Sequence, residues 1–144
     1  MKISFVVPGE PQALKRHRTF RRGANIGSYD PSKGDKADFL AKALAARPAS
    51  PIDGVPIDLK VTAIFSRPKS HYGTGKNSKK LKAYADVYHT KKPDADNVLK
   101  FVKDALNGVF WRDDCLVARA TITKLYAQDP QVLVSVETID REEF

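Results

Sequence analysis

The segment from Lys92 to Asp114, KPDADNVLKFVKDALNGVFWRDD, constrains the fold of this 144-residue chain most strongly. Its apolar residues recur at intervals of three and four, which predicts an amphipathic helix from Asn97 to Leu106. Pro93 cannot lie inside that helix, and Asn107-Gly108 is a typical helix stop, because glycine readily adopts the left-handed conformation. A helix with one apolar face has to be buried, so the remaining chain must supply a second layer.

The second layer is predicted to be a small β-sheet. Apolar and polar residues alternate over residues 3–7, 57–65 and 132–136, and residues 116–126 have the composition of a further strand. A second amphipathic helix is predicted over residues 35–47, where Pro48 stops it. We therefore expect a single α+β domain over residues 1–144, with a small mixed β-sheet and helices packed on one face.

Two segments are basic and show no regular apolar period. Residues 13–23 are predicted to form a basic loop or irregular hairpin, and residues 67–91 a long, mobile basic loop. The whole chain has a formal net charge of +8, which favours polyanionic partners. We expect nucleic-acid backbone to be bound by Lys15, Arg16, Arg18, Arg21, Arg22, Lys69, Lys76, Lys79, Lys80, Lys91 and Lys92.

Other classes of protein are disfavoured. The N-terminal apolar run is too short for a signal peptide, no stretch is long enough for a membrane helix, and no disulfide can form within a chain that has one cysteine. We expect a cytoplasmic protein with no membrane partner. The calcium-loop and phosphate-loop patterns both fail, so no small-molecule cofactor is expected. Cys115 is expected to be buried, with a raised pKa beside two aspartates.

Five acids of this basic chain are gathered between Lys92 and Asp114: Asp94, Asp96, Asp104, Asp113 and Asp114. Asp94 and Asp96 lie at the start of the predicted helix, and Asp114 can approach them if the connection through Trp111 doubles back. Oxygen ligands alone suit Mg²⁺ or Mn²⁺, and Lys100, one turn after Asp96, is placed to stabilise charge on a phosphate. This combination is typical of a metal-dependent nuclease.

Each of these residues also has an ordinary structural interpretation. Asp94 or Asp96 can be a helix N-cap, Asp96 and Lys100 can form an i,i+4 ion pair, and Asp113-Asp114 can be a solvated turn. The nuclease interpretation requires all three carboxylates to lie close together. The sequence therefore leaves a non-catalytic nucleic-acid-binding module open.

The same stretch closely resembles the RusA family of Holliday junction resolvases. The family pattern is K-P-D-x-D-N-x-x-K, a D-A-L-N-G helix end and then D-D, and every one of these residues is present between Lys92 and Asp114. Three more stretches, VPGEPQALKRHR, YDPSK and RPKSHYGTGKN, resemble segments of phage-type members. The N-terminal stretch departs from the family pattern, because it reads KRHR instead of K-x-R-x-R.

The resemblance implies a homodimeric, Mg²⁺-dependent endonuclease that resolves four-way DNA junctions by paired symmetric nicks in recombination and repair. It assigns catalysis and metal binding to Asp94, Asp96 and Asp114, with Asp113 as the alternative to Asp114, and a catalytic role to Lys100. Asn97, Asp104 and Asp113 are expected to orient the ligands. Tyr72, Tyr84 and Trp111 are candidates for stacking on unpaired bases. A nuclease of the same fold that acts on other branched DNA remains an alternative.

Overall fold

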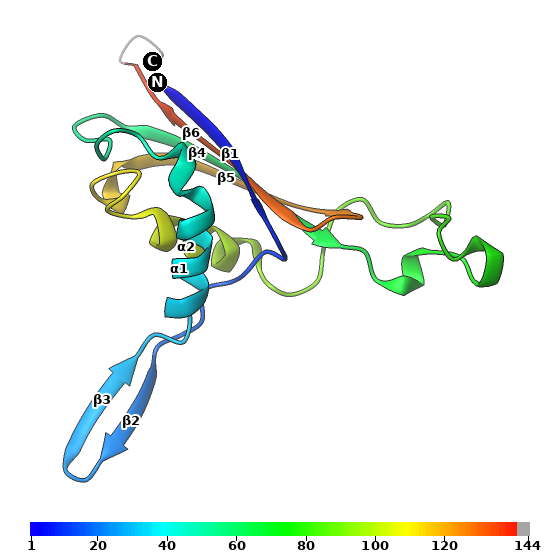
Figure 1. Ribbon diagram of the computed structural model, residues 1–144, viewed down its shortest axis with the longest axis horizontal. Helices are drawn as coiled ribbons and strands as arrows, with labels where there is room; N and C mark the ends of the chain where they lie inside the picture. The colour runs from blue at the N-terminus through cyan, green and yellow to red at the C-terminus, as the bar shows by residue number, and fades with distance from the viewer. Residues whose placement is uncertain (141–144) are drawn as a thin grey trace.

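The computed structural model describes residues 1–140 and is built around a four-stranded mixed sheet with the order β1-β6-β4-β5 (Figure 1). β6 (Gln131–Thr138) is antiparallel to both of its neighbours, β1 (Lys2–Pro8) and β4 (Ile57–Ser66). β4 is parallel to the edge strand β5 (Val117–Ala127). A parallel pair needs a long crossover, and here the crossover holds the basic loop and a helix.

One face of the sheet forms the floor of the core. Every second residue of β4 from Ile57 to Phe65 is buried, and so are Val132, Val134 and Val136 of β6. Because successive side chains of a strand point to opposite faces, this alternation directs one apolar face to the helices. The strands predicted at residues 57–65 and 132–136 are confirmed.

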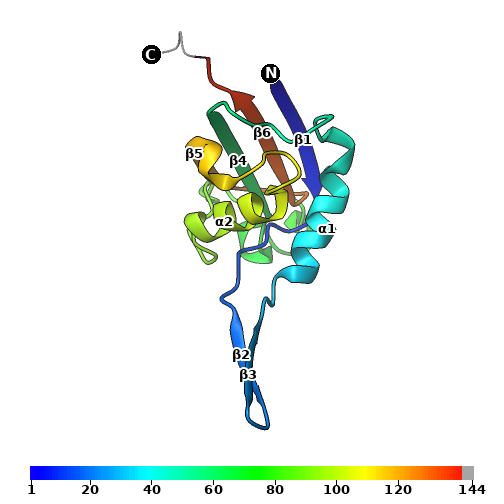
Figure 2. The ribbon, with the colours of Figure 1, turned by 90° about the vertical axis from the view of Figure 1, so that its left-hand side faces the viewer.

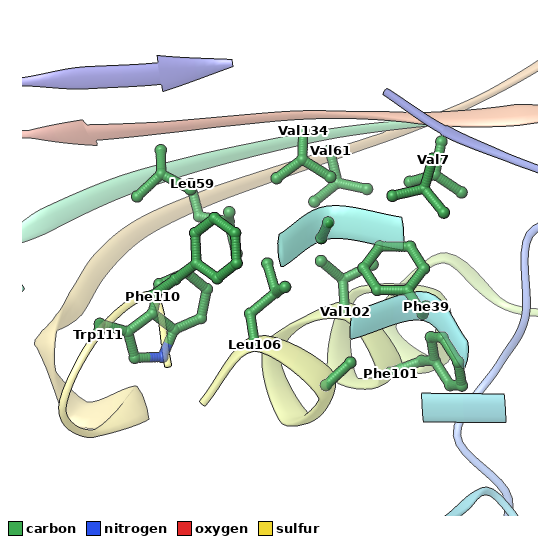
Figure 3. Close-up of a cluster of buried hydrophobic side chains, with 14 of the residues drawn as sticks. Val7, Phe39, Leu59, Val61, Phe101, Val102, Leu106, Phe110, Trp111 and Val134 are labelled. Atoms are coloured by element: carbon green, nitrogen blue, oxygen red, sulfur yellow. The ribbon is translucent and has the colours of Figure 1, made fainter. Parts of the chain in front are cut away.

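Two helices cover this face, α1 (Lys33–Ala43) and α2 (Ala95–Leu106), and a 3-10 turn η1 (Leu44–Ala46) extends α1. Figure 2 shows both helices on the same side of the sheet. Figure 3 shows their apolar side chains meeting those of β1, β4 and β6, and the Phe39 and Phe101 rings meet edge to face at 5.7 Å. α2 ends where the sequence predicts, with Asn107 as C-cap and Gly108 at φ +81°. The predicted α+β class, with helices on one face, is confirmed.

Two segments project from this body in different directions (Figure 1). β2 (Arg18–Arg22) and β3 (Asn25–Tyr29) form a regular antiparallel hairpin. The sequence predicted only a basic loop or irregular hairpin over residues 13–23, and it gave no prediction for β3. Residues 67–91 form the other projection, with short 3-10 turns η2 (Lys69–His71) and η3 (Gly75–Asn77). The mobility of this second segment stays a prediction.

His89 anchors the end of the 67–91 segment in the body. The residue is 7% exposed, and its ring stacks on Phe65 with 3.8 Å between centroids. Its Nδ1 has no hydrogen-bond partner within residues 1–140. Burial lowers the pKa of His89, and the charge of Lys124 lowers it further. The folded state therefore holds the neutral imidazole, whereas an unfolded histidine titrates at its ordinary pKa.

We expect the free energy of unfolding to fall between about pH 8 and about pH 5, because the unfolded state takes up the His89 proton first. The His89→Phe variant keeps an aromatic ring on Phe65 and should lose less stability over the same range. Denaturant melts of both proteins at the two pH values measure this difference. Equal losses in both proteins would show that His89 does not contribute to the acid sensitivity.

Candidate active site

The N-terminus of α2 presents two carboxylates to solvent. Asp94 is the N-cap residue, with extended backbone angles, and its carbonyl oxygen accepts the first helical hydrogen bond from the Val98 N–H at 3.2 Å. Its side chain makes no capping hydrogen bond with the backbone N–H groups of the first turn, so the carboxylate is free for another partner. Asp96 follows in the first turn, with its side chain 69% exposed. Both acids lie where the helix dipole favours negative charge.

Lys100 lies one turn further along the exposed face of α2. Its Nζ is 3.9 Å from Asp96 Oδ2, which is the i,i+4 pair that the sequence predicted, and its side chain is 61% exposed. A pair so exposed contributes little to stability, roughly 0.3–0.5 kcal/mol. Lys100 can therefore leave Asp96 and pair with a bound anion at a small cost in free energy.

Three hydrogen bonds fix the chain around this helix start. The Lys124 Nζ of β5 donates to the carbonyl oxygens of Lys91 and Pro93 at 2.8 and 2.7 Å, which fastens the entry to α2 onto the sheet. The Leu14 N–H donates to the Asn97 carbonyl oxygen at 3.0 Å. The basic N-terminal segment thus crosses α2 beside Asp94 and Asp96. An open depression at this point is lined by Lys92, Pro93, Asp94 and Asn97.

Asp114 lies at the other end of α2. It begins the 3-10 turn η4 (Asp114–Leu116), which precedes β5, and its Oδ1 accepts a hydrogen bond from Trp111 Nε1 at 2.8 Å. Trp111 is fully buried, and its carbonyl oxygen accepts from the Gly108 N–H just beyond the helix. The twelve residues of α2 span about 18 Å, and these contacts hold Asp114 at the C-terminal end, so it lies far from the helix start.

The expectation that Asp114 approaches Asp94 and Asp96 is therefore wrong within one chain. The connection does double back, but the burial of Phe110 and Trp111 anchors it over the C-terminal end of α2. Across residues 1–140, no three His, Cys, Asp or Glu side chains are grouped so that they could hold a metal ion. A metal site with three carboxylates does not fit this single chain.

The residues expected to support the site have other contacts in the structure. Asp104 Oδ2 accepts from Lys36 Nζ at 3.0 Å, and the same lysine pairs with Asp30. Asp113 Oδ1 accepts from the Cys115 N–H at 3.1 Å, which caps η4 locally. Only Asn97 lies beside Asp94. The role of all three in orienting ligands stays a prediction.

Cys115 is exposed, which contradicts the expected burial. Cys115 lies outside the core because the η4 turn packs the next residue, Leu116, against the apolar cluster. Local desolvation, followed by the charge of Asp113, raises the pKa of the Cys115 thiol as expected. A thiol of this kind is a poor nucleophile.

The contact between Asp114 and Trp111 gives a stability prediction. Asp114→Ala leaves the buried indole N–H without an acceptor and should lower the free energy of unfolding by about 1–3 kcal/mol. Asp114→Asn keeps a carbonyl oxygen at the same place and should cost much less. Urea denaturation of the two variants measures the difference, and equal losses would show that the hydrogen bond is unimportant for stability.

The predicted DNA-binding residues fall into three exposed groups. Arg16, Arg18, Arg21 and Arg22 lie on or next to the β2–β3 hairpin. The lysines of the long loop, Lys69, Lys76, Lys79 and Lys80, form the second group, and Lys91 and Lys92 at the entry to α2 form the third. Lys15 is also exposed, and its N–H donates to Ser32 Oγ at 2.9 Å. Their contact with DNA stays a prediction.

The stacking candidates are only partly in place. Trp111 is fully buried, which rules it out as a stacking candidate, whereas Tyr84 is 97% exposed. The structure reveals two further exposed aromatic residues that could stack on bases, Phe20 and Tyr29 on the hairpin, which the sequence analysis missed. The sequence feature that could have indicated them is the turn at Gly23, which separates two short runs that each contain an aromatic residue.

A basic α+β domain that presents carboxylates and a lysine at one helix start, together with an arginine-rich hairpin and a lysine-rich loop, is typical of an enzyme that acts on nucleic acid. The sequence matches the family model for Endodeoxyribonuclease RusA over residues 8–137, and the chain belongs to this family. It is 35% identical over 142 residues to the uncharacterized protein YqaN of Bacillus subtilis strain 168, and this match covers 95% of the chain and 96% of the relative.

Membership of the RusA family indicates endodeoxyribonuclease activity and recognition of branched DNA. The resemblance seen in the sequence is thereby confirmed. Within residues 1–140, no helix has the length and apolar character needed to cross a membrane.

Proposed function

We propose that this protein is a Mg²⁺-dependent, structure-specific endodeoxyribonuclease that resolves four-way DNA junctions by paired symmetric nicks, in recombination and repair. One observation carries the proposal. The full family motif, from Lys92 to Asp114, lies in a RusA match that covers most of the chain, and its Asp94, Asp96 and Lys100 are exposed at the start of α2. None of these three side chains is needed for the core, which favours a chemical role.

The electrostatics of the helix start support binding of a phosphodiester. Lys92 and Lys100 flank Asp94 and Asp96, and Lys15 follows the Leu14 contact with α2. Basic side chains draw the DNA backbone to the surface, while the two exposed carboxylates favour a divalent cation at the same place. Mn²⁺ is expected to substitute for Mg²⁺, because both ions accept oxygen ligands.

The position of Asp114 supports a homodimer. We infer that the Asp114 that completes each site comes from the second subunit, because burial of Trp111 holds the chain's own Asp114 at the far end of α2. Asp113 is the alternative ligand from the same turn. Two subunits related by a two-fold axis also match a junction with pseudo-two-fold symmetry, since paired nicks need two equivalent sites.

The proposal is tested with labelled four-way, flap and linear duplex DNA of matched sequence, each incubated in Mg²⁺ or in EDTA. We expect cleavage of the four-way junction in Mg²⁺, little cleavage of linear duplex, and none in EDTA. Preferred cleavage of the flap would point to a nuclease acting on other branches. Junction binding without cleavage of any substrate would instead identify a non-catalytic binding module.

Lys100→Ala should lower the rate of junction cleavage by about 100-fold with little change in affinity, because its positive charge matters most when charge builds on the phosphate. Lys103→Ala is the matched control, since Lys103 lies on the last turn of the same helix. Single-turnover cleavage and gel-shift binding separate the two effects. Equal losses of rate and affinity would make Lys100 a simple phosphate anchor.

A further inference from the structure

The β2–β3 hairpin is an arm that projects from the body (Figures 1 and 2). Every residue of its two strands is exposed except Gly27, which is half-buried. An isolated two-stranded ribbon is at best marginally stable in water, and this one exposes large apolar groups: Phe20 is 42%, Tyr29 48% and Ile26 74% exposed. The arm is thus built to contact something outside the described chain.

One face of the arm is a platform of planar side chains. The register pairs Arg18 with Tyr29, Phe20 with Gly27 and Arg22 with Asn25, so these six residues share one face. The Phe20 and Tyr29 ring centroids are 6.3 Å apart, and the Arg22 guanidinium lies 5.7 Å from the Phe20 centroid.

Gly27 is what allows this arrangement. A Cβ added there would lie 2.5 Å from the Phe20 ring, so only glycine lets the ring rest on the opposite strand. The opposite face of the hairpin, with Arg21 and Ile26, has no such stack. The two faces of the arm are therefore chemically different.

The charge of the arm identifies the partner. Residues 16–29 contain four arginines and no acid, and within residues 1–140 none of these arginines forms an ion pair. The next acid, Asp30, is already paired with Lys36 and accepts a hydrogen bond from the Ser32 N–H, which lowers its pKa. The uncompensated positive charge of the arm attracts a polyanion, and the arm itself offers no acid that could pair with basic residues of another protein.

The arm also emerges next to the candidate active site. The Leu14 N–H is bonded to the Asn97 carbonyl oxygen of α2, and the Lys15 N–H is bonded to Ser32 Oγ at the start of α1. These two contacts fix the base of the hairpin beside the first turn of α2. DNA held at Asp94 and Asp96 can therefore extend along the arm.

We propose that the arginine–aromatic face of the β2–β3 hairpin binds bases exposed at a DNA branch point and gives the protein its preference for branched over linear DNA. Arg18 and Arg22 contact phosphates, while Phe20 and Tyr29 stack on bases that are unpaired or partly unstacked at the branch. Aromatic stacking does not depend on base identity, so this face recognises DNA shape and not sequence. The inference rests on the proposed function.

Binding is measured in EDTA, so that cleavage plays no part, with a four-way junction and a linear duplex of matched sequence. We expect Phe20→Leu combined with Tyr29→Leu to weaken junction binding by about tenfold and to leave duplex binding unchanged. Arg18→Gln combined with Arg22→Gln should weaken both and reduce the salt dependence. Ile26→Thr, on the opposite face, is the matched control and should change neither affinity.

Contact between the arm and DNA can also be measured by fluorescence, with a variant that still binds DNA. Phe20→Trp adds an exposed indole to a chain whose only tryptophan, Trp111, is buried, so its fluorescence reports on the arm. We expect junction DNA to quench this signal more strongly than duplex DNA does. Equal quenching by the two DNAs, or an undiminished junction preference in the double leucine variant, would overturn the inference. If wild type itself shows no preference for the junction, the proposed function fails instead.

Discussion

Asp96→Asn is expected to bind four-way junctions at least as tightly as wild type and to leave them uncut. In the proposed site Asp96 faces the DNA backbone, so the substitution reduces repulsion of the DNA, while the neutral amide is a poor ligand for Mg²⁺. Asp96 is 69% exposed and its side-chain contact is with Lys100, so the fold should not change. Cleavage should fall on the order of 1000-fold, or about 4 kcal/mol of transition-state stabilisation.

The structure offers a matched control for this experiment. Asp38 on α1 is 68% exposed and also forms an i,i+4 pair, with Lys42 at 3.2 Å, but lies outside the motif. Asp38→Asn should therefore cleave like wild type. Gel-shift titration and single-turnover cleavage in Mg²⁺ measure both variants. Wild-type cleavage by Asp96→Asn would remove Asp96 from the catalytic site, and equal loss in both variants would make the effect one of general surface charge.

The second large effect is expected from mixing two inactive subunits. Asp96→Asn and Asp114→Asn should each be inactive alone. In a mixed dimer of the proposed kind, the Asp114→Asn subunit supplies intact Asp94 and Asp96, and the other subunit supplies an intact Asp114. One complete site is thereby restored, whereas sites built within one chain would stay broken in both subunits. Asp114→Asn suits this test, because its amide oxygen still accepts from Trp111 Nε1.

The mixed dimer is prepared by co-expression with two different affinity tags and purified over both. We expect it to nick junctions in one strand only, because it carries a single complete site. An inactive mixed dimer would show that the two subunits do not share residues in this way. Full activity of Asp114→Asn alone would exclude Asp114 from the site altogether.

Much of the fold could be predicted from local patterns. Pro93, Gly108 and the apolar spacing between them define α2 almost to the residue, because these signals act within one helical turn. The strict alternation of β4 likewise requires one buried face. The positions of Asp94, Asp96 and Lys100 follow directly, since they lie on or beside a helix whose orientation is set by its apolar stripe.

The position of Asp114 could not be predicted, because it depends on contacts between distant residues. The sequence indicates that the chain turns after α2, but burial of Phe110 and Trp111 decides over which end of the helix it turns. Trp111 is followed directly by three charged residues in the sequence and so resembles a residue at the edge of a surface turn. β3 was missed for a related reason, because NIGSY lacks the alternation of a half-buried strand when both faces meet solvent.

Mapping the nicks in both strand pairs of a four-way junction tests the central claim most directly. Wild-type protein in Mg²⁺ is incubated with junctions labelled on one strand at a time, and the cut sites are read at nucleotide resolution. A two-fold symmetric enzyme with two equivalent sites predicts nicks at equivalent positions in two opposing strands. Nicks unrelated by symmetry, or an uncut junction that the protein nevertheless binds, would contradict it.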